Sequence, residues 1–126
     1  MVEVLIALLL LGILGAGFLT VLANSSTHTL NANTRATAES IARTQMEYIK
    51  SVPYNATSNP PTYTAQALQA PLSATDWRVF VTAARLDPKN DGTANDDGLQ
   101  KIIVRVQNNK GGTWTDVMTL EGYKYA

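Results

Sequence analysis

Cysteine is absent from this chain of 126 residues, and histidine occurs only once, as His28. The absence of cysteine excludes disulfides, thiol chemistry and cysteine-based metal sites. A serine nucleophile activated by histidine would have to use His28, and no nucleophile-elbow motif supplies the serine. A glycine-rich phosphate-binding motif is also missing. We therefore expect that the chain is not an enzyme.

An excess of charge of one sign is lacking too, because ten basic and ten acidic residues give a formal net charge of zero. The charged residues form no run of like sign, and no segment of the sequence repeats. Such a balance does not favour a broad electrostatic patch for nucleic acid. A dedicated nucleic-acid ligand is therefore not expected.

What the sequence does contain is a nearly unbroken apolar run over residues 2–23, whose only charge is Glu3. A helix of that length covers roughly 30 Å at ~1.5 Å per residue, which is the thickness of the hydrocarbon part of a bilayer. A carboxylate at that depth costs about 2.5–3.5 kcal/mol and should have a partner. A cleaved secretory signal has basic residues before its apolar run, whereas Arg35 is the first lysine or arginine of this chain. We expect the segment to be retained.

The stretch VEVLIALLLLGILG, which starts at Val2, resembles the N-terminus of type IV pilins and of type II secretion pseudopilins. The resemblance covers residues 1–53 and is only architectural beyond them. In that family a prepilin peptidase cuts after a glycine, the new N-terminus is methylated, and a glutamate usually stands fifth in the mature chain. Because Glu3 stands third, we expect that the leader and the first two mature residues are missing from this sequence. A genuinely shorter N-terminus is the alternative.

The resemblance implies an assembly role for Glu3. Its carboxylate would meet the terminal amine, here that of Met1, of a neighbouring subunit in the apolar core of a filament. A buried carboxylate beside a buried ammonium is tolerable, whereas either charge alone is not. The alternative is a solvated Glu3 at the headgroup boundary of a membrane.

Three glycines interrupt the apolar run, and each lowers helix stability by about 1 kcal/mol relative to alanine. In lipid the helix should persist, because its backbone has no other hydrogen-bond partners there. In a protein filament it could melt locally at these positions. The alternative is close packing of helices on small residues. The glycines are Gly12, Gly15 and Gly17.

The sequence predicts an α+β fold, in which a long N-terminal helix over about residues 1–52 packs on a small antiparallel sheet of three to four strands, as in pilins. Residues 1–23 are its apolar half and residues 24–52 its amphipathic half, with Thr34 and Gln45 interrupting the apolar face. Pro53 ends the helix. The head, residues 53–126, begins with a loop. Strands are expected over 77–86, 100–107 and 114–120, with a turn over 108–112, and their apolar face should cover the helix stripe.

An acidic loop over residues 87–98 could hold calcium, because it crowds oxygen ligands and two glycines together. Its spacing does not match an EF-hand. Type II secretion pseudopilins often bind calcium in a loop of the head, and the resemblance implies four ligands by position. The alternative is a turn built on Asx hydrogen bonds. The four candidate ligands are Asp91, Asn95, Asp96 and Asp97.

Two asparagines, Asn24 and Asn55, begin sequons for N-linked glycosylation. Such short patterns are often fortuitous, and the serine- and threonine-rich stretch around Asn24 could equally carry O-linked sugar.

Together these features predict a structural subunit, a pilin that polymerises through its N-terminal helix into an extracellular type IV pilus-like filament. Its expected partners are other copies of itself, the cytoplasmic membrane before assembly, a prepilin peptidase and a pilus assembly platform. A minor pilin or a type II secretion pseudopilin is the near alternative. A single-pass anchored binding domain that never polymerises is the alternative from another class. Whether such a filament serves adhesion, motility, DNA uptake or secretion stays open.

Overall fold

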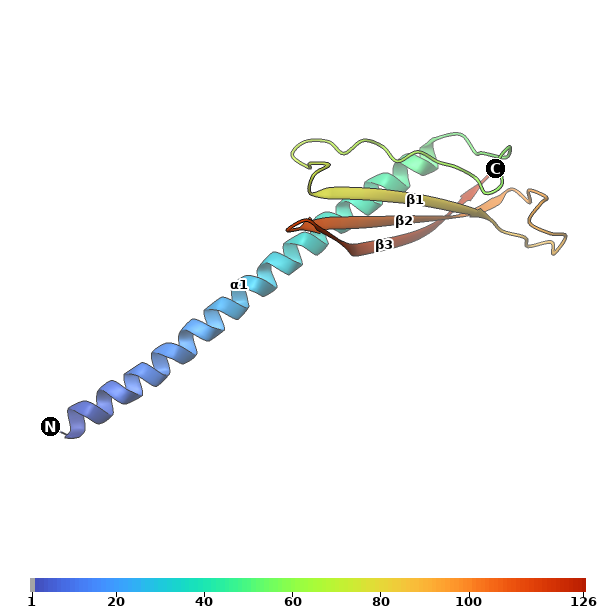
Figure 1. Cartoon of the computed structure of the whole chain (residues 1–126). Helices are drawn as coiled ribbons and strands as arrows, with labels where there is room; N and C mark the ends of the chain where they lie inside the picture. Colours follow the sequence, from blue (N-terminus) through green and yellow to red (C-terminus); the bar gives the residue numbers. More distant parts are fainter. Residues whose placement is uncertain (1) are drawn as a thin grey trace. The chain divides into compact units, whose positions relative to one another are not determined.

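The computed structural model describes residues 2–126, without the side chains of Asn24, Ser26 and Thr27. Within these residues it contains a helix, α1 (Val2–Ser51), followed by three strands, β1 (Trp77–Arg85), β2 (Leu99–Lys110) and β3 (Thr113–Tyr125) (Figure 1). The chain divides into two compact units, Met1–Asn33 and Thr34–Ala126. The expected α+β fold, a long N-terminal helix packed on an antiparallel sheet, is confirmed, with three strands in the sheet.

The second unit is built around the last turns of α1. Their buried side chains recur at the helical period and form the stripe that faces the sheet. The helix ends at Ser51, two residues before Pro53, which cannot continue it. Hydrogen bonds from Ser51 Oγ (2.7 Å) and from the Val52 amide (3.2 Å) to the Tyr48 carbonyl oxygen close the last turn. The buried stripe consists of Ala38, Ile41, Ala42, Met46 and Ile49.

The sheet has the order β1-β2-β3, and both pairs of neighbouring strands are antiparallel. The central strand β2 alternates strictly over most of its length, so that Ile102, Val104 and Val106 are fully buried against α1. A bulge interrupts the pairing with β3 between Val106 and Gln107.

The two later strands are longer than the sequence indicates, because only Gly111 and Gly112 lie between them. Both glycines have positive φ angles, 61° and 89°. A tight two-residue hairpin turn needs this conformation at both positions, which glycine adopts without strain. The expected five-residue turn over 108–112 is therefore wrong, and the strands extend into it.

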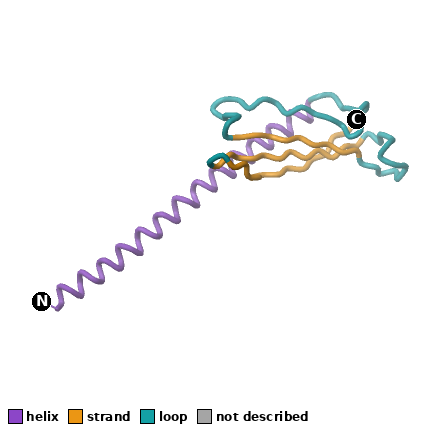
Figure 2. The backbone as a smooth tube through the Cα atoms, viewed as in Figure 1, coloured by secondary structure: helices purple, strands orange, loops and turns teal. Residues whose placement is uncertain are grey.

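The long loop 53–76 has no regular secondary structure (Figure 2). Two buried amide side chains, those of Gln45 and Gln100, hold it in place. Gln45 donates from Nε2 to the Gln66 carbonyl oxygen (2.9 Å) and accepts the Gln66 amide at Oε1 (2.8 Å). Gln100 donates to the Asn55 carbonyl oxygen (2.7 Å) and accepts the Tyr63 hydroxyl (2.6 Å). Gln45, which interrupts the apolar face in the sequence, thus holds the loop against the helix.

Lys124, on the inward face of β3, closes the end of α1. Its side chain is buried, and its ammonium donates to the carbonyl oxygens of Ile49 (2.9 Å), Lys50 (3.0 Å) and Val52 (2.6 Å). Carbonyls at a helix C-terminus lack partners within the helix and carry partial negative charge. Burial lowers the pKa of Lys124 from its ordinary value of 10.5.

Candidate functional site: the apolar helix segment and the acidic loop

The apolar segment, residues 2–23 of α1, exposes its large hydrophobic side chains all around the helix. Their exposed fractions range from 54% at Ile6 to 72% at Phe18 in the isolated chain. A helix that is apolar on every side is normally covered by lipid or by protein. By length and composition this helix could cross a membrane, a test that signal sequences near an N-terminus also pass.

Glu3 lies in the first turn of α1 and is exposed. The positive end of a helix dipole favours an anion at this position. The predicted partner group, the amine of Met1, lies outside the described residues. The pairing of these two charges between neighbouring subunits therefore stays a prediction.

The helix runs without interruption through the three glycines of the apolar segment, Gly12, Gly15 and Gly17. Among the described residues, no heavy atom outside the adjoining helix backbone lies within 4 Å of a Cβ atom built on any of them. Packing inside one chain therefore does not require glycine here. Melting of the helix at these positions in a filament stays a prediction.

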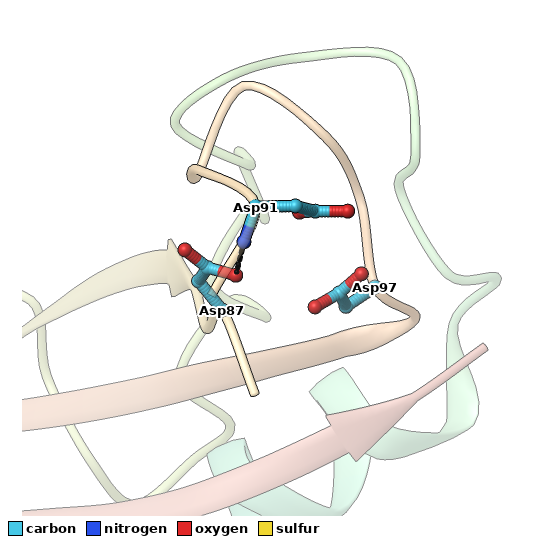
Figure 3. Close-up of side chains that lie close together, drawn as sticks. All are labelled: Asp87, Asp91 and Asp97. Atoms are coloured by element: carbon cyan, nitrogen blue, oxygen red, sulfur yellow. Dashed lines mark hydrogen bonds between the residues drawn. The ribbon is translucent and has the colours of Figure 1, made fainter. Parts of the chain in front are cut away.

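The acidic loop, residues 87–98, brings three carboxylates together (Figure 3). Oxygens of Asp87, Asp91 and Asp97 lie within 4.8 Å of one another. Asp87 accepts the amides of Asp91 (2.9 Å) and Gly92 (2.8 Å), which fold the loop around its carboxylate. Asp97 accepts the Lys89 amide (3.1 Å) and lies 2.9 Å from the Lys89 ammonium.

Among the described residues, Lys89 is the only cation that lies within salt-bridge distance of this carboxylate cluster. Its hydrogen bond to Asp97 lowers the pKa of that carboxyl and raises the pKa of Lys89. Three carboxylates facing one ammonium leave an excess of negative charge. The cluster could therefore accept a further cation.

Asp96 belongs to a different network, which joins the acidic loop to the loop after α1. It accepts the Tyr54 hydroxyl (2.5 Å) and the Gly98 amide (3.0 Å) at Oδ1, and its Oδ2 lies 4.0 Å from Arg85 Nε. Arg85 also donates to the carbonyl oxygen of Ala56 (2.5 Å). Burial, together with Asp96, raises the pKa of Tyr54 to about 12, and the Tyr54 hydrogen bond lowers the pKa of Asp96.

The structure therefore brings together only part of the predicted calcium set. Asp91 and Asp97 meet, Asp96 is occupied by Tyr54, and Asn95 donates to the Asp91 carbonyl oxygen at 3.5 Å. The third carboxylate of the cluster is Asp87, which the predicted set omits. The sequence feature that could have identified Asp87 as a member of the cluster is its position at the start of a turn, four residues before Asp91.

Of the two sequon asparagines, Asn24 has a side chain that the structure does not describe. Asn55 is half-buried and forms an Asx turn, accepting the amides of Thr57 (3.1 Å) and Ser58 (3.3 Å). Its Nδ2 donates to the Thr62 carbonyl oxygen (3.2 Å). A sugar on Nδ2 would replace one of its two hydrogens and leave the other for this contact, and glycosylation stays a prediction.

Comparison of the chain with models of protein families, with curated proteins and with solved structures finds no match in any of the three.

Proposed function

We propose that the chain is a pilin-like structural subunit, which polymerises through α1 into an extracellular filament of the type IV pilus kind. The observation that carries the proposal is the apolar segment, which is exposed on every side of the isolated chain and has a single charge, Glu3. Before assembly this segment would hold the subunit in the cytoplasmic membrane with the head outside. In the filament the same surface would be covered by other copies.

Burial of the apolar segment would drive assembly. About 1,500 Å² at ~25 cal/mol per Å² corresponds to tens of kcal/mol before the cost of ordering the subunits. Assembly exchanges lipid contacts for protein contacts, so that the net gain per subunit is much smaller. In this proposal Glu3 sets the register of each subunit, because a buried carboxylate is tolerated only where a neighbour's amine meets it.

Replacement of Glu3 by alanine tests this role. We expect Glu3→Ala to abolish extracellular filaments while the chain still inserts into the membrane, because the change removes a charge from the apolar segment. Glu47→Ala is the matched control, since Glu47 is an exposed glutamate elsewhere on the same helix. Filament yield is measured in sheared extracellular fractions, and membrane insertion by fractionation. Unchanged filament yield in Glu3→Ala would contradict the proposed role.

The intact mass of the chain in sheared filaments separates the near alternatives. A dominant species heavier than this sequence by about two residues and a methyl group would establish a main subunit. A chain found only in membranes would leave the minor-pilin, pseudopilin and non-polymerising anchor alternatives. Of these alternatives, the non-polymerising anchor does not explain Glu3, the charge inside the apolar segment.

Calcium binding by the acidic loop is a second candidate function, and the proximity of Asp87, Asp91 and Asp97 favours it. Carboxylate oxygens are the ligands that calcium prefers. Calorimetric titration of the detergent-solubilised chain with calcium chloride should show binding that Asp91→Asn weakens. Asp76→Asn is the control, because Asp76 is exposed and precedes the opposite end of β1. Absence of a binding signal in the wild type would exclude this function.

A further inference from the structure

The sheet face that points away from α1 carries a cluster of arginine and aromatic side chains. The Arg78 guanidinium lies 4.3 Å from the centroid of the Trp114 ring and 5.2 Å from that of Phe80, and Arg105 lies 5.2 Å from the Phe80 centroid. Phe80 remains 38% exposed. These four residues, Arg78, Phe80, Arg105 and Trp114, are called the arginine–aromatic face below. Stacking on rings holds the guanidinium groups in place.

Hydrogen bonds across the strands also fix the arginine–aromatic face. Arg78 donates from Nε to Gln107 Oε1 (2.7 Å), and Gln107 in turn donates to Asp116. Arg105 lies 3.9 Å from the Asp116 carboxylate. Among the described residues, Asp116 is the one carboxylate within salt-bridge distance of Arg105, and Arg78 reaches it only through Gln107, so that the face carries two guanidinium groups and one negative charge. Both retain N–H donors in the planar fork that suits a second carboxylate.

The opposite charge excess lies at the other end of the same sheet, in the acidic loop. That loop follows Arg85 at the end of β1, whereas Arg78 stands at its beginning (Figures 1 and 2). Arg78 lies seven strand residues from Arg85, and Arg105, opposite Phe80, lies five, so that at ~3.3 Å per residue the two guanidinium-bearing positions are roughly 23 Å and 17 Å from the start of the loop. These separations are about two to three times the Debye length of about 8 Å at physiological ionic strength. The two charge excesses therefore do not neutralise each other within one head.

We propose that the arginine–aromatic face binds the acidic loop of a neighbouring copy of this chain. Two complementary surfaces on different parts of one molecule form a head-to-tail contact, which repeats in an open helical assembly. This inference rests on the proposed filament and adds to it a contact between heads. The contact also fixes the rotation of each head relative to the next, because only one orientation pairs the opposite charges.

Charge reversal provides the first test. Arg78→Glu and Asp91→Arg, each alone, place like charges at the contact and should lower filament yield about tenfold or more. The two changes together restore opposite charges, and filament yield should recover. Glu47→Arg is the control, because it reverses an exposed charge of α1 outside both surfaces and should leave the yield unchanged.

Crosslinking provides the second test, since the chain has no cysteine of its own. Thr119 is exposed opposite Arg105 in the register of β2 and β3, and Thr93 is exposed in the acidic loop. Filaments that carry Thr119→Cys and Thr93→Cys together should form a disulfide-linked ladder of many subunits with an added thiol oxidant. Filaments that carry only one of these changes should not. The measurement is made in EDTA, because calcium and a guanidinium would compete for the same carboxylates.

The outcomes separate this inference from the proposed function. A ladder together with rescue by the double reversal supports the contact. Filaments that assemble, give no ladder and tolerate Arg78→Glu overturn the contact and leave the filament proposal standing. A wild-type chain that forms no filaments overturns both. A fourth outcome is that Arg78→Glu filaments assemble normally but no longer bind an anionic polymer. This outcome would overturn the contact and would mean that the arginine–aromatic face binds a partner other than this chain.

Discussion

Replacement of Lys124 by methionine removes the charged group that closes the C-terminal end of α1. Methionine keeps an unbranched apolar side chain of similar length, and therefore changes the packing little. It leaves the carbonyl oxygens of Ile49, Lys50 and Val52 without the ammonium that now donates to all three. The strand β3 then loses its polar attachment to the helix.

The size of the effect follows from opposing contributions. A hydrogen bond from a charged donor stabilises a fold by about 1.5–3 kcal/mol, and a cation at a helix C-terminus adds up to about 2 kcal/mol. These contributions overlap, because one ammonium makes all the contacts. Methionine also avoids the cost of burying a charge, and carbonyls near the surface regain water. We expect a net loss of about 2–3 kcal/mol in the free energy of unfolding.

Thermal unfolding of the full chain in detergent, followed by near-ultraviolet circular dichroism, measures this loss. That signal reports the packing of the aromatic side chains, including the buried Trp77, and not the detergent-covered part of α1. For a unit of this size, a loss of 2–3 kcal/mol should lower Tm by about 10–20 °C. Lys50→Met is the matched control, because Lys50 is an exposed lysine in the last turn of the same helix. Its change should stay within about 0.5 kcal/mol.

A Lys124→Met variant that unfolds like Lys50→Met would refute this reasoning. It would mean that the three carbonyls find water as readily as they find the ammonium, so that burial of the charge cancels its hydrogen bonds. A full loss of folding would show that the attachment is worth more than the contributions above allow.

Three further predictions concern the loops and the apolar segment. Tyr54→Phe removes a hydrogen bond to the Asp96 carboxylate and should lower Tm by a few degrees in the same assay, with Tyr125→Phe at an exposed position as control. Lys89 lowers the pKa of Asp97 below its ordinary value of 3.8, so that this carboxyl stabilises the fold above about pH 4 and ceases to do so as the pH falls further. The rate of amide exchange in the acidic loop should therefore rise as the pH falls below about 4, after correction for the intrinsic exchange rate. Asp97→Asn should remove this dependence on pH. Gly15→Ala should stabilise the helix by about 1 kcal/mol, because nothing within one chain opposes a methyl group there. If the glycines serve the filament, filament yield should nevertheless fall, and an unchanged yield would exclude local melting at this position.

The fold follows from the sequence wherever periodicity is strong. The stripe around Ile41 and Ile49 and the alternation around Val104 suffice to predict a helix packed on a sheet. The extent of β3 is less evident, because Gly122 and Lys124 are unusual in a strand with a buried face. Gly122 is explained by close approach to α1, since a Cβ atom there would lie 2.8 Å from the Met46 sulfur. Tertiary contacts of this kind override strand propensity.

The candidate sites were predictable in composition but not in geometry. A loop rich in aspartate indicates a cation site, yet the partners of its carboxylates come from distant parts of the chain. Tyr54 binds Asp96 across 42 positions of sequence, and no local pattern marks that pair. The arginine–aromatic face depends in the same way on the register of three strands, which places Arg78 opposite Gln107. Only the folded sheet brings such residues together.

Polar attachments hold the C-terminal strand and the long loop of this head. The chain has no cysteine, so that no disulfide can do this. Instead, Lys124 attaches β3 to the end of α1, while Gln45 and Gln100 attach the loop 53–76 to the helix and to the sheet. All three side chains are buried and bind backbone groups, which would be costly to leave without partners. A covalent link constrains the unfolded chain, whereas these contacts act only in the folded state. The head is therefore held at its C-terminus by contacts that can form and break reversibly with folding.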